Sequence, residues 1–243
     1  MNYYFLLEDS QSFIKILPKW FEYIEFNCTR VPDISQIEKN NYVLQSGHGV
    51  TQLITRALFD TIDTIISNPG KIDHLVIVLD AESESMESRK QQVIDKINDK
   101  YNQEELDFEI NIFVCNRCIE TWLLGRKNLY PSYEETIDTA EYYKYFETHF
   151  RNHYNHYNIE LNDPEKMLQP TDYTSPVARY HFKYFHDLCQ YNNLCKKEKL
   201  KYTKSKPQIA MDKQFFKGLI NRIDNTEHLL SFREFITFLR NAT

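Results

Sequence analysis

The segment His74-Leu75-Val76-Ile77-Val78-Leu79 gives the strongest strand signal in the chain, and Asp80-Ala81-Glu82 follows it directly. After His74 the residues are all apolar as far as Leu79. A strand that does not alternate between apolar and polar residues is typical of the interior of a sheet covered on both faces. We therefore expect a buried sheet with this segment near its middle.

Strand and helix patterns alternate on both sides of this segment. Further strands are expected at 3–7, 42–44 and 108–114, and helices with one apolar face at 13–21, 50–66, 86–101 and 119–124. Such alternation implies right-handed crossovers and a mostly parallel sheet. The sequence therefore predicts an α/β domain at 1–130, in which about four mostly parallel strands are flanked by helices.

The second half of the chain shows helical patterns and no clear strand. Helices are expected at 177–194, 215–223 and 232–239. Ser231, with Glu234 three residues later, matches the Ser-x-x-Glu capping pattern, so we expect Ser231 to cap the last helix. We expect 131–243 to form a mainly helical C-terminal region that packs on the first domain.

The glycine content argues against the common nucleotide-binding motifs. The chain has only five glycines among 243 residues. Their spacing gives neither G-x-G-x-x-G nor G-x-x-x-x-G-K, the two patterns that cradle phosphates in dinucleotide- and nucleotide-binding domains. We therefore do not expect the chain to bind nucleotides by itself.

Three features of the sequence indicate where in the cell the protein is located. The first residues lack a basic segment, and no apolar run approaches the roughly 18 residues of a membrane span. Five cysteines, an odd number at irregular spacing, are typical of free thiols in a reducing compartment. Cys115 and Cys118 form a lone C-x-x-C pair, which we interpret as buried thiols rather than a metal knuckle. These features predict a cytoplasmic protein that does not enter a membrane.

Positive charge is concentrated in one short segment. The net charge of the chain is −6, yet residues 196–206 hold six lysines against the single Glu198, a local charge of +5. A basic segment in an acidic protein indicates a polyanionic partner, whose binding would weaken steeply with salt. A solvated lysine-rich loop is an equally good interpretation. Under the first interpretation, the residues that contact nucleic acid are Lys199, Lys201, Lys204 and Lys206.

Acidic residues fall where the expected strands end. Glu8 follows the first strand, Asp80 and Glu82 follow the strand at 74–79, and Glu120 comes shortly after the strand at 108–114. Parallel strands bring their carboxyl ends to one edge of a sheet, where ligands bind in α/β folds. Carboxylate oxygens are the ligands that Mg²⁺ and Mn²⁺ prefer. The sequence therefore predicts a divalent-metal site at this edge, while Asp9 is expected to cap the first helix.

Three of these segments resemble motifs of a known family. They are Leu6-Leu7-Glu8-Asp9, Val76 to Glu82 with its D-x-E, and Ile119-Glu120-Thr121-Trp122-Leu123-Leu124-Gly125. Their order is similar to that of TOPRIM-type domains, and above all to small TOPRIM-like proteins related to the overcoming-lysogenization-defect nucleases that carry an E-x-W-L-L motif. Two later segments, beginning at Tyr202 and at Ser231, are similar to the C-terminal pattern of that group.

The resemblance implies a nuclease that uses Mg²⁺ or Mn²⁺. By position, Glu8 would bind metal or act as general base, and Asp80 would be the leading metal ligand. The second acid of the family's D-x-D is here Glu82, one methylene longer, which puts the metal geometry in doubt. Glu120 would add a ligand for a second metal, and Lys204 would neutralise charge on the scissile phosphate. Two metals would activate water and stabilise both the attacking and the leaving oxygen.

The resemblance also implies partners, and other functions stay open. Similar proteins act with an ABC- or SMC-like ATPase in defence against phage or mobile elements, and the missing phosphate loop means that ATP hydrolysis would need such a partner. The substrate could be DNA or RNA, and a homodimer is compatible with the sequence. The main alternative is a catalytically silent module that keeps the fold and binds a partner protein or nucleic acid. A phosphotransferase or primase-like activity ranks last because no nucleotide-binding loop is visible.

Overall fold

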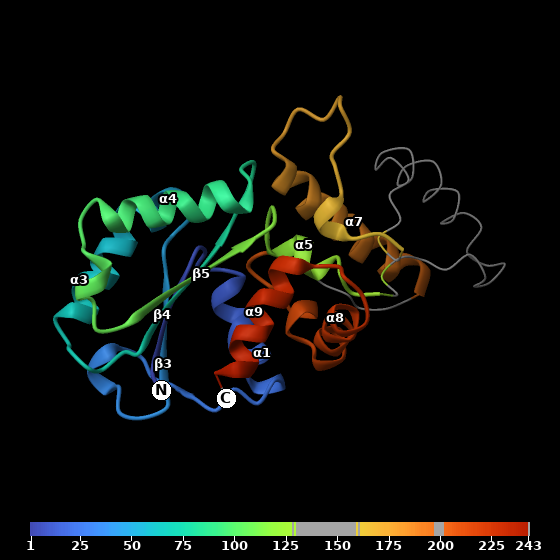
Figure 1. The fold of residues 1–243 in the computed structure, drawn as a ribbon. Helices are drawn as coiled ribbons and strands as arrows, with labels where there is room; N and C mark the ends of the chain where they lie inside the picture. Colours follow the sequence, from blue (N-terminus) through green and yellow to red (C-terminus); the bar gives the residue numbers. More distant parts are fainter. Residues whose placement is uncertain (128, 130–158, 160, 197–201, 243) are drawn as a thin grey trace.

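The computed structural model of the protein describes residues 1–127, 129, 159, 161–196 and 202–242. Its centre is a five-stranded parallel sheet in the order β2-β3-β1-β4-β5 (Figure 1). The strands are β1 (Tyr3–Leu7), β2 (Thr29–Arg30), β3 (Asn41–Ser46), β4 (His74–Asp80) and β5 (Glu109–Cys115). The four strands expected from the sequence are therefore confirmed, within two residues at each end.

The strand that the sequence did not predict is β2, at the edge of the sheet. It has two residues, both exposed, and pairs with the start of β3. A strand this short carries no periodicity, and exposed side chains give it no apolar signal. The sheet is thus one strand wider than expected, and it is entirely parallel.

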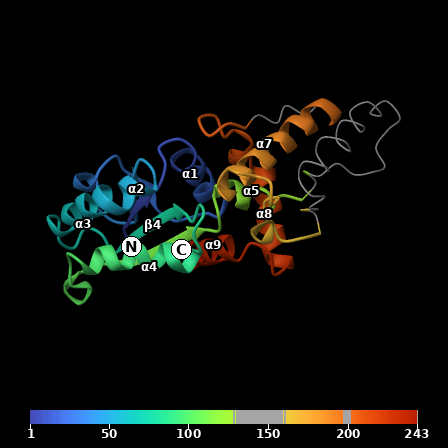
Figure 2. The same cartoon turned by 90° about the horizontal axis from the view of Figure 1, so that it is seen from above.

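Helices cover both faces of the sheet, as two views at right angles show (Figures 1 and 2). In one layer α2 (Val50–Gln52) passes through a π-helical turn (Leu53–Ala57) into α3 (Leu58–Ile66), beside α4 (Met86–Asn98). The other face is covered by α1 (Phe13–Tyr23) and α9 (Leu230–Asn241). The same core continues beyond the sheet with α5 (Ile119–Leu123), α7 (Val177–Lys196) and α8 (Lys213–Asn225). None of the helices in the described ranges is long and apolar enough to cross a membrane.

The apolar strand β4 is buried on both faces. Val76 and Val78 belong to the core under α1 and α9, whereas Leu75, Ile77 and Leu79 belong to the core under α3 and α4. Successive side chains of a strand point to opposite faces, so an uninterrupted apolar run supplies both cores at once. This confirms the interpretation of 74–79 as an interior strand.

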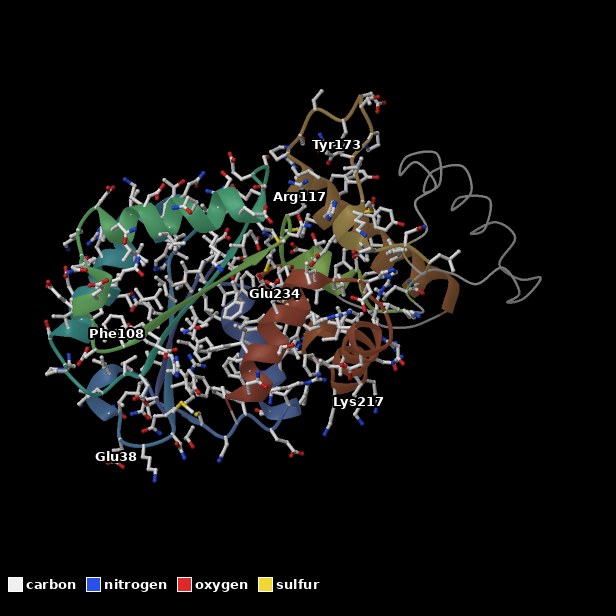
Figure 3. The ribbon with its side chains drawn as sticks, viewed as in Figure 1. Glu38, Phe108, Arg117, Tyr173, Lys217 and Glu234 are labelled. Carbon is white, nitrogen blue, oxygen red and sulfur yellow. The ribbon has the colours of Figure 1, made fainter. Side chains whose placement is uncertain are left out.

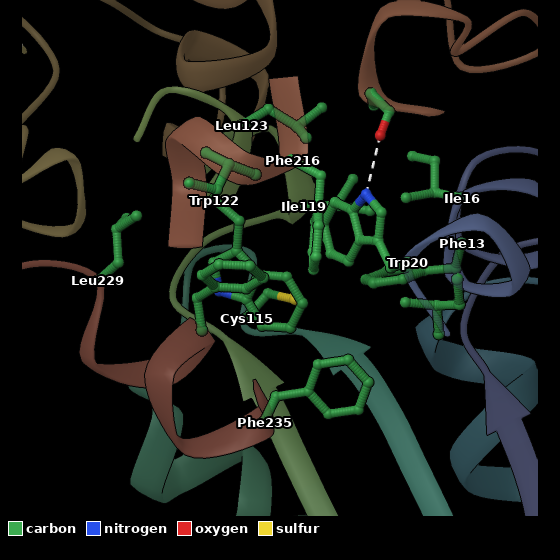
Figure 4. Packing of buried hydrophobic residues seen from close by; sticks show 14 of the residues in the cluster. Phe13, Ile16, Trp20, Cys115, Ile119, Trp122, Leu123, Phe216, Leu229 and Phe235 are labelled. Carbon is green, nitrogen blue, oxygen red and sulfur yellow. Dashed lines mark hydrogen bonds between the residues drawn. The ribbon is translucent and has the colours of Figure 1, made fainter. Parts of the chain in front are cut away.

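The C-terminal helices share one core with the sheet (Figure 4). Trp20 of α1 lies 5.2 Å, ring to ring, from Phe216 of α8, and its indole donates a hydrogen bond of 2.8 Å to the carbonyl of Ala210. Trp122 of α5 lies 5.2 Å from Phe232 of α9. The described part of 131–243 therefore packs on the first half, and the division into two regions at 130 stays a prediction.

The expected cap of the last helix is wrong. The helix α9 begins at Leu230, after Leu229 in a left-handed conformation with φ 55°, so Ser231 lies inside the first turn. Its buried hydroxyl accepts a hydrogen bond of 2.7 Å from the indole of Trp122 and donates to the carboxylate of Glu165. The capping pattern misled because tertiary partners use the hydroxyl that would otherwise cap the helix.

Candidate active site

Three acidic residues, Glu8, Asp80 and Glu120, lie near one another at the carboxyl edge of the sheet. We call this group of acids the rim. Glu8 follows β1 and Asp80 ends β4, its direct neighbour, while Glu120 lies in the first turn of α5 after β5. Glu8 is 9% exposed, Asp80 is 5% exposed and Glu120 is fully buried. Buried carboxylates without compensation are costly, so such a cluster needs partners or a function.

Glu8 is tied to the neighbouring strand. Its Oε2 accepts a hydrogen bond of 2.5 Å from the backbone N–H of Asp80, and its own N–H donates to the carbonyl of Val78. Burial raises the pKa of Glu8 to about 7. The hydrogen bond from Asp80 lowers this pKa, and the nearby charge of Glu82 raises it. Glu8 can therefore exchange a proton near neutral pH.

Asp80 is the most centrally placed acid of the rim. Burial raises its pKa well above the usual range, the charge of Glu8 adds to this, and the charge of Lys204 opposes it. Its Oδ1 is buried and has no hydrogen-bond partner among the described residues. A buried oxygen of this kind calls for an explanation such as an ion or a water.

Glu120 is oriented by a residue from the C-terminal half. Its Oε1 accepts a hydrogen bond of 2.5 Å from the hydroxyl of Tyr202, and its buried Oε2 has no partner in the described part of the chain. Burial, together with Glu120 itself, raises the pKa of Tyr202 well above its usual value, so the phenol keeps its proton. Glu120 therefore presents one satisfied and one unsatisfied oxygen.

A buried hydrogen-bonded chain holds α5 in place. His181 of α7 contacts the carbonyl of Met167 with Nε2 at 2.9 Å and the hydroxyl of Thr121 with Nδ1 at 2.8 Å. Because a carbonyl only accepts, Nε2 carries the hydrogen and Thr121 donates to Nδ1. Burial lowers the pKa of His181 to about 4, which keeps the ring neutral. Thr121 adjoins Glu120, so this chain fixes the segment that carries the acid.

Lys204 faces the rim from a tight turn. Backbone hydrogen bonds join Thr203 and Lys206 in both directions and put Lys204 at the tip. As a whole residue Lys204 is exposed, while its ammonium end approaches the carboxylates. Burial of that end opposes protonation, but the charges of Glu120 and then Asp80 outweigh it and raise the pKa of Lys204. The turn thus brings a permanent cation to the acids.

Glu82, the second acid of D-x-E, lies apart from this group. Its side chain is 53% exposed, and its carboxylate is 4.0 Å from the guanidinium of Arg89 on α4. Its backbone is left-handed, with φ 56°, and its N–H donates to the carbonyl of Arg117, which is itself left-handed with φ 82°. Arg117, labelled in Figure 3, follows the end of β5 by two residues. Glu82 therefore shapes the loop at the rim, near enough to Glu8 to affect its pKa.

The remaining predicted residues divide into three groups. Asp9 accepts hydrogen bonds from the backbone N–H groups of residues 11, 12 and 13. The helix begins at Phe13 and its N-cap is Ser12, so the expectation that Asp9 caps it is wrong: Asp9 holds the turn that leads into the helix. Lys206 is exposed in the same turn as Lys204, and Cys115 and Cys118 are buried free thiols as expected. The expected nucleic-acid contacts Lys199 and Lys201 lie outside the described residues.

Two residues at the site had no role in the sequence analysis, Tyr202 and His181. Tyr202 is 82 positions from Glu120, and only the fold brings them together. The available signals were its position two residues before Lys204 and its place at the start of a segment that resembles the family's C-terminal pattern. His181 lies in a helical pattern rich in aromatic residues, where the sequence gives a buried histidine no distinguishing mark.

The chemistry of the rim suits a hard divalent cation. Among the residues that the structure describes, no three His, Cys, Asp or Glu side chains are already arranged to hold an ion. The unsatisfied oxygens of Asp80 and Glu120, however, are buried carboxylate oxygens, the donor type that Mg²⁺ and Mn²⁺ take. The donor set therefore fits such an ion, which would have to draw the carboxylates together.

Comparison of the chain with protein-family models, with curated proteins and with solved structures gave no match.

Proposed function

We propose that this chain is a TOPRIM-like, divalent-metal-dependent nuclease that hydrolyses phosphodiester bonds of DNA or RNA. The observation that carries the proposal is the pair of buried, unsatisfied oxygens on Asp80 and Glu120, next to Glu8 and facing Lys204. Acids and a cation supplied by separate segments to the carboxyl edge of a parallel sheet are typical of sites that bind phosphate through a metal.

Each residue of the rim has a role in this proposal. Asp80, Glu120 and Glu8 would hold Mg²⁺ or Mn²⁺, which when bound lowers the pKa of a water and neutralises charge on a phosphoryl oxygen. Glu8, with its pKa of about 7, is suited to accept a proton near neutral pH. Lys204 is suited to neutralise the substrate phosphate, and Lys206 in the same turn to contact the adjacent backbone.

The proposal includes a partner. The chain has no phosphate-loop motif, so ATP-dependent control would come from a separate ABC- or SMC-like ATPase. A role in defence against phage or mobile elements is part of the same proposal, and it rests on the resemblance of the motifs alone.

A catalytically silent interaction module is the second candidate, and one observation favours it. Glu82 is exposed and pairs with Arg89 instead of joining the rim carboxylates, so the second acid of the motif does not complete the site. In such a module the rim would bind a partner without cleaving it.

A cleavage assay separates the two candidates. The purified chain would be incubated with single- and double-stranded DNA and with tRNA in Mg²⁺, Mn²⁺ or EDTA, beside Glu8→Gln and Asp80→Asn. Glu165→Gln is a matched control, because Glu165 is also a buried carboxylate with its pKa raised by burial to about 7, yet it bonds Ser231 away from the rim. We expect metal-dependent cleavage that both rim variants lose and the control retains.

The opposite results are also informative. Cleavage that persists in Asp80→Asn would contradict the assignment of the rim. If no substrate is cut, the assay is repeated after a pull-down with the ATPase partner. No cleavage in that complex would favour the silent module.

A further inference from the structure

The phenol of Tyr202 connects the C-terminal part of the chain to a rim carboxylate. Its hydroxyl donates a hydrogen bond of 2.5 Å to Oε1 of Glu120. This length is at the short end of the range for hydrogen bonds between hydroxyl and carboxyl oxygens. The bond uses one oxygen of Glu120 and leaves Oε2 without a hydrogen-bond partner in the described ranges.

The ring of Tyr202 is held by α7, so the hydroxyl cannot move freely. Phe185 lies 4.8 Å from it, ring to ring, in an edge-to-face arrangement, and Phe182 lies 6.4 Å away. Tyr202 is only 4% exposed. Edge-to-face packing of buried rings fixes their orientation as well as their position. The place of the hydroxyl is therefore set by a helix that does not itself carry a rim acid.

The turn that follows Tyr202 is anchored separately. The ammonium of Lys15 on α1 donates a hydrogen bond of 2.7 Å to the carbonyl of Ser205, and Thr203 and Lys206 close the turn by backbone bonds. Lys204 at the tip has its ammonium 5.9 Å from the ring centre of Phe182. Tyr202 and Lys204 thus belong to one short, anchored segment, in which Tyr202 bonds Glu120 and the ammonium of Lys204 faces Glu120 and Asp80.

We propose that Tyr202 is a positioning residue of the rim, whose hydroxyl orients Glu120 so that Oε2 is offered to a divalent cation while its anchored ring places Lys204 beside the same acids. This inference rests on the proposed function. It adds that a residue of the C-terminal region organises a metal site built on the sheet. Tyr202 acts through Glu120 and touches neither the cation nor the substrate.

The first test is direct binding of Mn²⁺ to the full chain, followed by electron paramagnetic resonance. Tyr202→Phe keeps the ring and removes only the hydroxyl. Partners of metal ligands typically contribute a factor of ten or more to affinity, so we expect half-saturation at an about tenfold higher Mn²⁺ concentration. Tyr23→Phe is the control, because that phenol also donates one short bond, 2.6 Å to the carbonyl of Met211, away from the rim. Unchanged binding in Tyr202→Phe would overturn the inference.

A second measurement needs no metal and keeps the inference separate from the proposed function. Unfolding midpoints would be compared for wild type, Tyr202→Phe, Glu120→Gln and the double variant. We expect Tyr202→Phe to lower the midpoint less in the Glu120→Gln background than in the wild type, because coupled groups are not additive. If the wild type binds no Mn²⁺, the proposed function fails, and this comparison still decides: additive shifts would show that Tyr202 does not position Glu120.

Discussion

The backbone N–H of Asp80 donates a hydrogen bond of 2.5 Å to Oε2 of Glu8, which joins the acid that follows β1 to the acid that ends β4. Because the bond uses the main chain of Asp80, the carboxylate of Asp80 stays available for another partner, and its Oδ1 has none among the described residues. The two strands are direct neighbours, so the pairing of the sheet itself places the two acids together.

Glu8 should make the protein less stable as the pH rises. Its pKa is raised from 4.5 to about 7, so the folded chain keeps a proton that the unfolded chain releases. The resulting stabilisation is complete below the unfolded pKa and is lost as pH rises through the folded pKa. A shift of this size corresponds to about 3 kcal/mol. In urea denaturation between about pH 5 and pH 8, Glu8→Gln should lose less stability than the wild type; equal losses would count against the shift.

His181 should have the opposite pH dependence. Burial lowers its pKa from 6.5 to about 4, so the unfolded chain takes up a proton that the folded chain refuses. Its contribution is complete above the unfolded pKa and is lost as pH falls through the folded pKa. We expect the ring proton resonances of His181 to stay those of a neutral imidazole at about pH 5.5. A midpoint near the ordinary value of histidine would contradict the hydrogen-bonded chain from Thr121 to Met167.

Replacement of Glu82 by Asp should leave cleavage nearly unchanged. If the extra methylene were the only handicap of the D-x-E motif, Glu82→Asp would increase the rate. The exposed side chain of Glu82, however, is turned toward the buried Arg89, whose guanidinium lies 4.0 Å from its carboxylate, and away from the rim acids. We expect a rate close to that of the wild type, since Glu82 is not one of the carboxylates that would hold the metal. A marked increase would show that Glu82 is a metal ligand after all.

Lys206 should contribute to the salt dependence of nucleic-acid binding. It is exposed in the turn beside Lys204, and the hydrogen bonds that close the turn use its backbone, not its ammonium. Lys206→Gln should therefore preserve the turn and reduce the slope of log affinity against log salt by about one. Lys90→Gln on α4 serves as the control. An unaltered slope would assign Lys206 to solvent.

Local patterns predicted most of the fold, and they missed a very short strand and a residue with distant partners. The apolar run at 74–79 predicted a strand buried on both faces, and β4 supplies both cores. The edge strand β2 is too short to carry a pattern, and Ser231 lost its expected capping role because Trp122 and Glu165 bind its hydroxyl. The first miss follows from the length of the strand, and the second from partners that lie far away in the sequence.

The site was predictable only in part, because some of its contacts join residues far apart in the sequence. Glu8 and Asp80 follow strands, and parallel strands must end at one edge, so their proximity could be inferred. Glu82 also follows a strand, but a left-handed backbone turns its side chain toward Arg89, and no sequence pattern marks that turn. Tyr202 could not be linked to Glu120 without the packing of α7.

The claim on which the proposed function depends is that the rim acids hold a divalent cation. Mn²⁺ binding to the purified chain tests this most directly, with Asp80→Asn as the rim variant and Glu165→Gln as the buried-carboxylate control. We expect the wild type and Glu165→Gln to bind Mn²⁺ and Asp80→Asn to lose that binding. A wild type that binds no Mn²⁺, or an Asp80→Asn variant that binds it equally well, would contradict the claim.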